Sequence, residues 1–108
     1  MKFEEASDPH YARWFVSENG TFFIGVLNYL FGQKCIQVLF KNLLEHQDRY
    51  VIREWRTYKP QLVETLIKEI KHNLANVEAG WGDWALVEKF LPEKTAKYLE
   101  DESIEEKS

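Results

Sequence analysis

The segment from Pro60 to Val77 constrains the fold of this chain more than any other, because its apolar residues recur with the period of an α-helix. The recurring apolar positions are Leu62, Val63, Leu66, Ile67, Ile70, Leu74 and Val77. Pro60 suits the first turn of a helix, and Gly80 is the residue type at which helices commonly end. The sequence therefore predicts a long helix from Pro60 to about Asn76, with one side buried in a core.

Two preceding segments show a similar period. From Gln33 to about His46 the apolar positions fall three and four residues apart, and the period continues from Arg49 to Tyr58. Lys59 marks the boundary, because the residue before a proline avoids the helical region of backbone angles. We therefore expect two further helices ahead of Pro60.

The first third of the chain allows two interpretations. The pair Asp8-Pro9 is typical of a helix start and would open a short helix that ends near Val16. The pair Asn19-Gly20 is also a preferred two-residue turn of a β-hairpin, here between Arg13–Glu18 and Thr21–Ile24. Both arms are apolar on both faces, so the spacing does not separate helix from strand and the two alternatives stay open.

The C-terminal part has weaker helix signals and an acidic end. Asp83 is a candidate cap for a short helix from Trp84 to Phe90, which Pro92 separates from a last segment around residues 93–99. Residues 100–108 hold five acidic residues and one lysine, which predicts a flexible tail. The whole chain is predicted to be mainly α, a compact bundle of about five helices in one domain of residues 1–99. An α+β fold that contains the N-terminal hairpin is the alternative.

Length, charge and cysteine content limit the class of protein. A chain of 108 residues supports one core, and its 14 basic and 18 acidic residues give a net charge of −4. This charge argues against general binding to nucleic acid or anionic lipid, although it leaves a local basic patch open. The single Cys35 forms no internal disulfide, and the N-terminus has no basic and apolar secretory pattern, which predicts a cytoplasmic protein. The most apolar stretch, Thr21–Phe40, is interrupted by polar residues, so we expect no membrane partner.

The residues that carry chemistry form no recognisable catalytic or metal-binding pattern. Glu69 and His72 have the spacing of half a di-iron motif, but only one copy exists and it lies away from the apolar stripe of its helix. The glycines do not match a phosphate-binding loop, and no serine lies in a nucleophile motif. We therefore predict no catalytic residue, metal or cofactor, and expect the chain not to be an enzyme.

Two groups of residues are candidate binding surfaces. The first is Glu78, Trp81 and Asp83, where glycines free an indole from the preceding helix and place it beside two carboxylates. The second is Arg49, Arg53 and Arg56, which would share one side of the predicted helix and bind an anion there.

These features favour a small acidic module that binds another protein by stoichiometric contact, as immunity proteins, antitoxins and other inhibitors do. The negative charge suits a basic partner, such as a nuclease that the module neutralises. Two alternatives stay open. The first is a nucleic-acid-associated helical regulator that uses Arg49, Arg53 and Arg56, and the second is a small enzyme whose site is assembled from distant residues.

Overall fold

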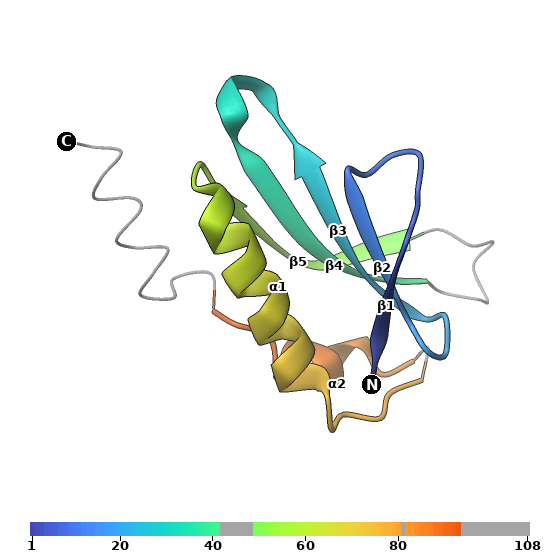
Figure 1. Ribbon diagram of the computed structural model, residues 1–108. Helices are drawn as coiled ribbons and strands as arrows, with labels where there is room; N and C mark the ends of the chain where they lie inside the picture. Colours follow the sequence, from blue (N-terminus) through green and yellow to red (C-terminus); the bar gives the residue numbers. More distant parts are fainter. Residues whose placement is uncertain (42–48, 81, 94–108) are drawn as a thin grey trace.

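The first half of the chain forms an antiparallel sheet in which each strand pairs with the next along the sequence (Figure 1). The computed structural model describes residues 1–41, 49–80 and 82–93. The strands are β1 (Phe3–Ala6), β2 (Arg13–Ser17), β3 (Phe22–Asn28), β4 (Lys34–Lys41) and β5 (Arg49–Thr57). A short 3-10 turn, η1 (Leu30–Gly32), joins β3 to β4, and the helices α1 (Pro60–Leu74) and α2 (Trp84–Glu88) follow the sheet.

The prediction of a five-helix bundle is therefore wrong, and the fold is α+β. Residues 34–41 form β4 and residues 49–57 form β5, where the sequence predicted two helices. The short helix from Pro9 to Val16 is also wrong, because β2 occupies Arg13–Ser17. The alternative N-terminal hairpin is present, because β2 and β3 pair on either side of Asn19-Gly20, but it is not closed by the expected two-residue turn. The loop spans residues 18–21, the N–H of Gly20 donates to the carbonyl of Ser17, and Gly20 alone of the pair has a positive φ, of 71°.

The prediction of a long helix after Pro60 is confirmed. The buried residues of α1 are Val63, Leu66, Ile67, Ile70 and Leu74. Leu62 is only partly buried, and the helix ends at Leu74, two positions before the predicted end. Within the described residues no helix is both long and apolar enough to cross a membrane.

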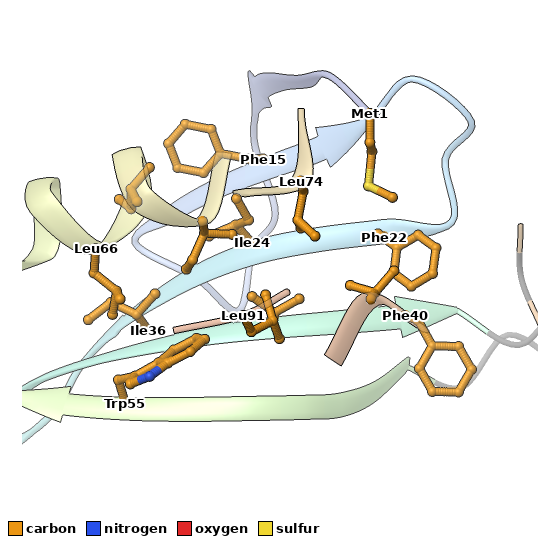
Figure 2. Close-up of a cluster of buried hydrophobic side chains, with 14 of the residues drawn as sticks. Met1, Phe15, Phe22, Ile24, Ile36, Phe40, Trp55, Leu66, Leu74 and Leu91 are labelled. Atoms are coloured by element: carbon orange, nitrogen blue, oxygen red, sulfur yellow. The ribbon is translucent and has the colours of Figure 1, made fainter. Parts of the chain in front are cut away.

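The main core lies between one face of the sheet and the helix α1 (Figures 1 and 2). Alternate residues of the central strands point to this face, as the two-residue period of a strand requires. They are Phe22, Ile24 and Val26 of β3 and Ile36, Val38 and Phe40 of β4. Figure 2 shows Leu66 of α1 beside Ile36, with Phe40 at the edge of the cluster.

The opposite face of the sheet, called the open face below, carries a smaller core of Trp14, Phe23 and Leu39. The loop between β1 and β2 covers part of it, because the Tyr11 hydroxyl donates to Gln37 Oε1 at 2.8 Å. The Tyr11 ring lies directly over Gly25: a β-carbon added there would lie 2.5 Å from Tyr11 Cδ1. The central strands are therefore apolar on both faces, which hides the alternation typical of a strand.

Candidate functional site

Three aromatic side chains stack at the end of the sheet where β4 finishes and β5 begins. We call Phe40, Tyr50 and Trp84 the aromatic end. Phe40 is buried and pairs in register with Tyr50, and its ring centroid lies 5.2 Å from that of Tyr50 and 6.1 Å from that of Trp84. Tyr50 remains 37% exposed and Trp84 45% exposed. The aromatic end is therefore an apolar surface anchored in the core through Phe40 and open to contact on its outer rings.

The acidic residues predicted to form a partner surface lie in the segment that leads to Trp84. Glu78 is exposed, and so is Asp83, the residue before α2. The backbone N–H of Gly80 donates to Asp83 Oδ2 at 2.9 Å, and Asn19 Nδ2 donates to the carbonyl of Ala79 at 2.7 Å. The Asn19 bond ties the segment to the β2–β3 turn, and the Gly80 bond fixes the Asp83 carboxylate against the backbone of the segment, one residue before Trp84.

The sequence interpretation of this segment was partly wrong about individual side chains. Asp83 occupies the N-cap position of α2 without bonding the helix backbone, because its carboxylate accepts from Gly80 instead. Trp84, which the sequence indicated only as the start of a short helix, is 45% exposed. Trp81 lies outside the described residues, so its predicted role as the aromatic anchor stays a prediction.

The three arginines of the predicted basic stripe do not share one face. β5 carries a bulge, in which Leu39 pairs with Val51 but Val38 pairs with Arg53, so Ile52 is an extra residue that reverses the alternation. Arg53 consequently points to the helical side. There its guanidinium donates to the carbonyls of Leu91 at 3.3 Å and Pro92 at 3.1 Å.

Arg49 and Arg56 lie on the open face, each against an aromatic ring and a carboxylate. The Arg49 guanidinium sits 4.7 Å from the ring centre of Trp14 and 2.7 Å from Asp8 Oδ2. Arg56 contacts Glu54 Oε2 at 3.2 Å. The helical geometry on which this group was predicted is thus wrong. The anion site stays a prediction, and no single face of the sheet carries all three arginines.

Cys35 belongs to a polar network on the open face, near the end of the sheet that carries the β3–β4 turn. Gln37 Nε2 donates to Glu54 Oε1 at 2.8 Å, and the thiol of Cys35 also hydrogen-bonds to Glu54. Burial alone would raise the pKa of Glu54, but the bonds from Gln37 and Cys35 and the charge of Arg56 outweigh it and lower that pKa. Burial and the Glu54 carboxylate raise the pKa of the Cys35 thiol to about 12. Cys35 is therefore a structural residue and not a nucleophile.

We expect Cys35 to resist thiol reagents in the folded protein, because the reactive form is the thiolate and the thiol is fully buried. Titration with a chromogenic disulfide at mildly alkaline pH checks this. The thiol should react slowly in buffer and fully once denaturant is added. Reaction in buffer at the rate of a free cysteine would contradict the placement of Cys35.

The β3–β4 turn exposes apolar residues that the sequence analysis did not single out. We call Tyr29, Leu30, Phe31 and Gly32 the hairpin tip. Leu30 is 81% exposed and Phe31 92% exposed. Phe31 has a φ of 63° and Gly32 a φ of 79°, and the N–H of Gln33 donates to the carbonyl of Leu30. Positive φ at both central residues is the requirement of a type I′ turn, at whose first central position asparagine is favoured and phenylalanine is unusual. In the sequence, Gly32 between the apolar residues of β3 and those of β4 was the local signal that could have predicted this turn.

Replacing Phe31 with asparagine is expected to stabilise the fold by about 1 kcal/mol, because asparagine tolerates the left-handed conformation better. The change removes almost no packing, since Phe31 is exposed. Denaturant titration measures the gain. Leu30→Asn is the matched control, because Phe31 is the one described non-glycine residue with positive φ. An equal effect of the two substitutions would contradict the strained turn.

Chemistry-bearing side chains do not cluster elsewhere in the part of the chain that the structure describes. Groups of three or more histidine, cysteine, aspartate or glutamate residues placed to hold a metal ion are absent from it. Glu69 and His72 are exposed on α1, on the side away from the core as predicted. Comparison with protein-family models, with curated proteins and with solved structures gives no match. The surfaces described above are thus the basis for a functional proposal.

Proposed function

We propose that this chain is a small cytoplasmic protein-binding module that acts by stoichiometric contact, in the manner of immunity proteins, antitoxins and other inhibitors. The observation that carries the proposal is the aromatic end, where Tyr50 and Trp84 stack on the buried Phe40 and stay partly exposed. Tryptophan and tyrosine held in a rigid position are the side chains that most often dominate binding between proteins, because they bury a large area at a small cost in entropy.

The charge beside the aromatic end favours a basic partner. Asp83 directly precedes Trp84 and Glu78 is exposed in the same segment, within a chain whose net charge is −4. Opposite charges around an apolar centre speed association and exclude partners of the same charge. A basic nuclease that the module neutralises fits this pattern.

The nucleic-acid alternative has less support. Arg53 donates hydrogen bonds to the backbone carbonyls of Leu91 and Pro92 on the helical side of the sheet. Arg49 and Arg56 lie on the open face, so the three arginines form no continuous basic surface. A nucleic-acid-binding face normally gathers such side chains along one groove or stripe.

The test is affinity capture from the native host with wild-type, Trp84→Ala and Asp83→Asn chains as baits. Wild type should capture one protein in equimolar amount, and Trp84→Ala should lose about tenfold or more of the affinity. Asp83→Asn removes the charge but keeps the acceptor for the Gly80 N–H, so it should weaken capture and reduce its salt dependence at unchanged stability.

Phe31→Asn is the matched control, because it replaces an exposed aromatic residue in the hairpin tip, outside the aromatic end. It should capture the partner as wild type does. Capture that is unaffected by Trp84→Ala would contradict the assignment of this surface. Absence of any equimolar partner in native extracts would contradict the proposed function itself.

A further inference from the structure

A pocket lies between the β2–β3 turn and the segment that follows α1, where the start of the chain lies beside the end of that helix (Figure 1). Its apolar lining comes from Met1, Val77 and Ala79, all of which are buried. Its acidic lining comes from Glu18 in the turn and Glu78 in the segment, both of which are exposed. A buried apolar floor with carboxylates at the opening suits a long side chain that has an aliphatic stem and a cationic head.

Hydrogen bonds hold the two walls of the pocket together. The amide of Asn19 links them, because its Nδ2 donates to the carbonyl of Ala79 at 2.7 Å. The Oδ1 of the same amide accepts from the Ser17 hydroxyl at 2.6 Å and from the Thr21 N–H at 3.1 Å, which fixes its orientation. The pocket is therefore preformed, and a side chain that enters it pays little for reorganisation of the walls.

The charge around the pocket is negative once its cations are counted. Glu18 and Glu78 make no ion pair within the described residues, and Asp83 adds a third carboxylate through its bond to the N–H of Gly80 in the pocket wall. The N-terminal ammonium donates to two backbone carbonyls at 2.9 and 3.0 Å. Lys2 lies opposite Glu18 on the neighbouring strand and does not line the pocket. Three negative charges thus face two positive ones, which favours a cation.

The pocket adjoins the aromatic end. Phe22, which follows the β2–β3 turn, pairs in register with Phe40. Asp83, which is bonded to the pocket wall, directly precedes Trp84. An interface of ordinary size centred on Trp84 therefore extends to the pocket. Arginine is enriched in such interfaces, and its planar guanidinium carries several donors, so that one head group bonds two carboxylates at once.

We propose that the pocket receives an arginine side chain of the partner protein, with its aliphatic stem against Met1 and Val77 and its guanidinium between Glu18 and Glu78. This assignment rests on the proposed function and deepens it, because it names a side chain that the partner presents beside the contact with Trp84. It also separates two roles within the surface: the aromatic end supplies apolar contact, and the pocket selects for a basic group.

The first experiment needs no partner. Isotope-labelled full chain is titrated with acetyl-arginine methylamide and followed by the amide signals of Asn19, Ala79 and Gly80. The matched probe is acetyl-citrulline methylamide, in which a neutral urea group replaces the guanidinium at the same shape. The arginine probe should cause saturable shifts at millimolar concentration, and the citrulline probe should cause none, because only the cation pairs with the carboxylates. The double variant Glu18→Gln with Glu78→Gln should lose the shifts at an unchanged denaturation midpoint.

The second experiment uses the captured partner. The double variant should bind it about tenfold more weakly than wild type does. Glu69→Gln is the matched control, because it removes an exposed carboxylate of α1 outside the pocket, and it should bind as wild type does.

The two experiments separate the pocket from the function on which it rests. Absence of saturable shifts with the arginine probe would overturn the arginine pocket, and so would equal shifts with the citrulline probe. Equal affinity of the double variant and wild type for the captured partner would also overturn it, while capture that depends on Trp84 would leave the proposed function standing. Saturable binding of the arginine probe to a chain that captures no partner would support the pocket and contradict the proposed function.

Discussion

Leu66→Ala is expected to lower the free energy of unfolding by about 2–5 kcal/mol. Leu66 is 1% exposed in the middle of α1, where its side chain packs against the sheet beside Ile36 (Figure 2). The substitution removes apolar area from the core and leaves a cavity that the surrounding strands fill only partly. Chemical denaturation followed by tryptophan fluorescence measures the loss.

Leu62→Ala is the matched control on the same helix, because Leu62 is only partly buried and its loss leaves no closed cavity. It should cost clearly less than Leu66→Ala. A loss under about 1 kcal/mol for Leu66→Ala would mean that this side of α1 is not packed against the sheet.

Gly25→Ala is expected to lower the free energy of unfolding by about 1–3 kcal/mol through overpacking of the open face. The new methyl group would lie 2.5 Å from Tyr11 Cδ1, 2.6 Å from Tyr11 Cε1 and 3.1 Å from a ring atom of Trp14. The Tyr11 ring must therefore move, which breaks the hydrogen bond from its hydroxyl to Gln37 and uncovers the core around Trp14. Denaturant titration gives the magnitude.

A double-mutant cycle with Tyr11→Ala identifies the cause of that loss. In the Tyr11→Ala background the same glycine substitution should cost little, because the clashing ring is gone. Gly82→Ala provides a comparison, since an added methyl group there meets nothing within 4 Å. Equal costs of Gly25→Ala in both backgrounds would show that the Tyr11 ring does not cover Gly25 in solution.

The helix α1 was predictable because its signals agree with one another. One face of α1 is buried and the other is in solvent, so its apolar positions follow the helical period without interruption. Pro60 then fixes the start, as observed. The predicted end was two residues late, because the prediction relied on Gly80 as a stop signal. The helix ends earlier, at Leu74, and Gly80 does not have the left-handed conformation of a helix-ending glycine.

The strands β4 and β5 were not predictable by the same reasoning. β4 is buried on both faces, and a continuous run of apolar residues contains helical spacings by chance as readily as strand spacings. In β5 the bulge at Ile52 interrupts the alternation, so apolar and polar residues change faces within the strand. The long-range covering of the open face by Tyr11, which makes β4 a buried strand, leaves no local trace in the sequence.

The candidate surfaces were predicted in part. Exposure of Glu78 and Asp83 agrees with a contact surface, but the choice of aromatic residue rested on local glycines alone. Trp84 was named only as the start of a short helix, whereas in the structure this first residue of α2 stacks on Phe40 and stays exposed. The arginine stripe failed for a different reason, because it depended on helical angles that β5 does not have.

The most direct test of the proposed function is calorimetric titration of the captured partner into the wild-type chain, Trp84→Ala and Phe31→Asn. We expect one partner molecule per chain, a dissociation constant about tenfold or more weaker for Trp84→Ala, and an unchanged constant for Phe31→Asn. Equal dissociation constants for wild type and Trp84→Ala would contradict the account, because the aromatic end would then contribute nothing to the contact.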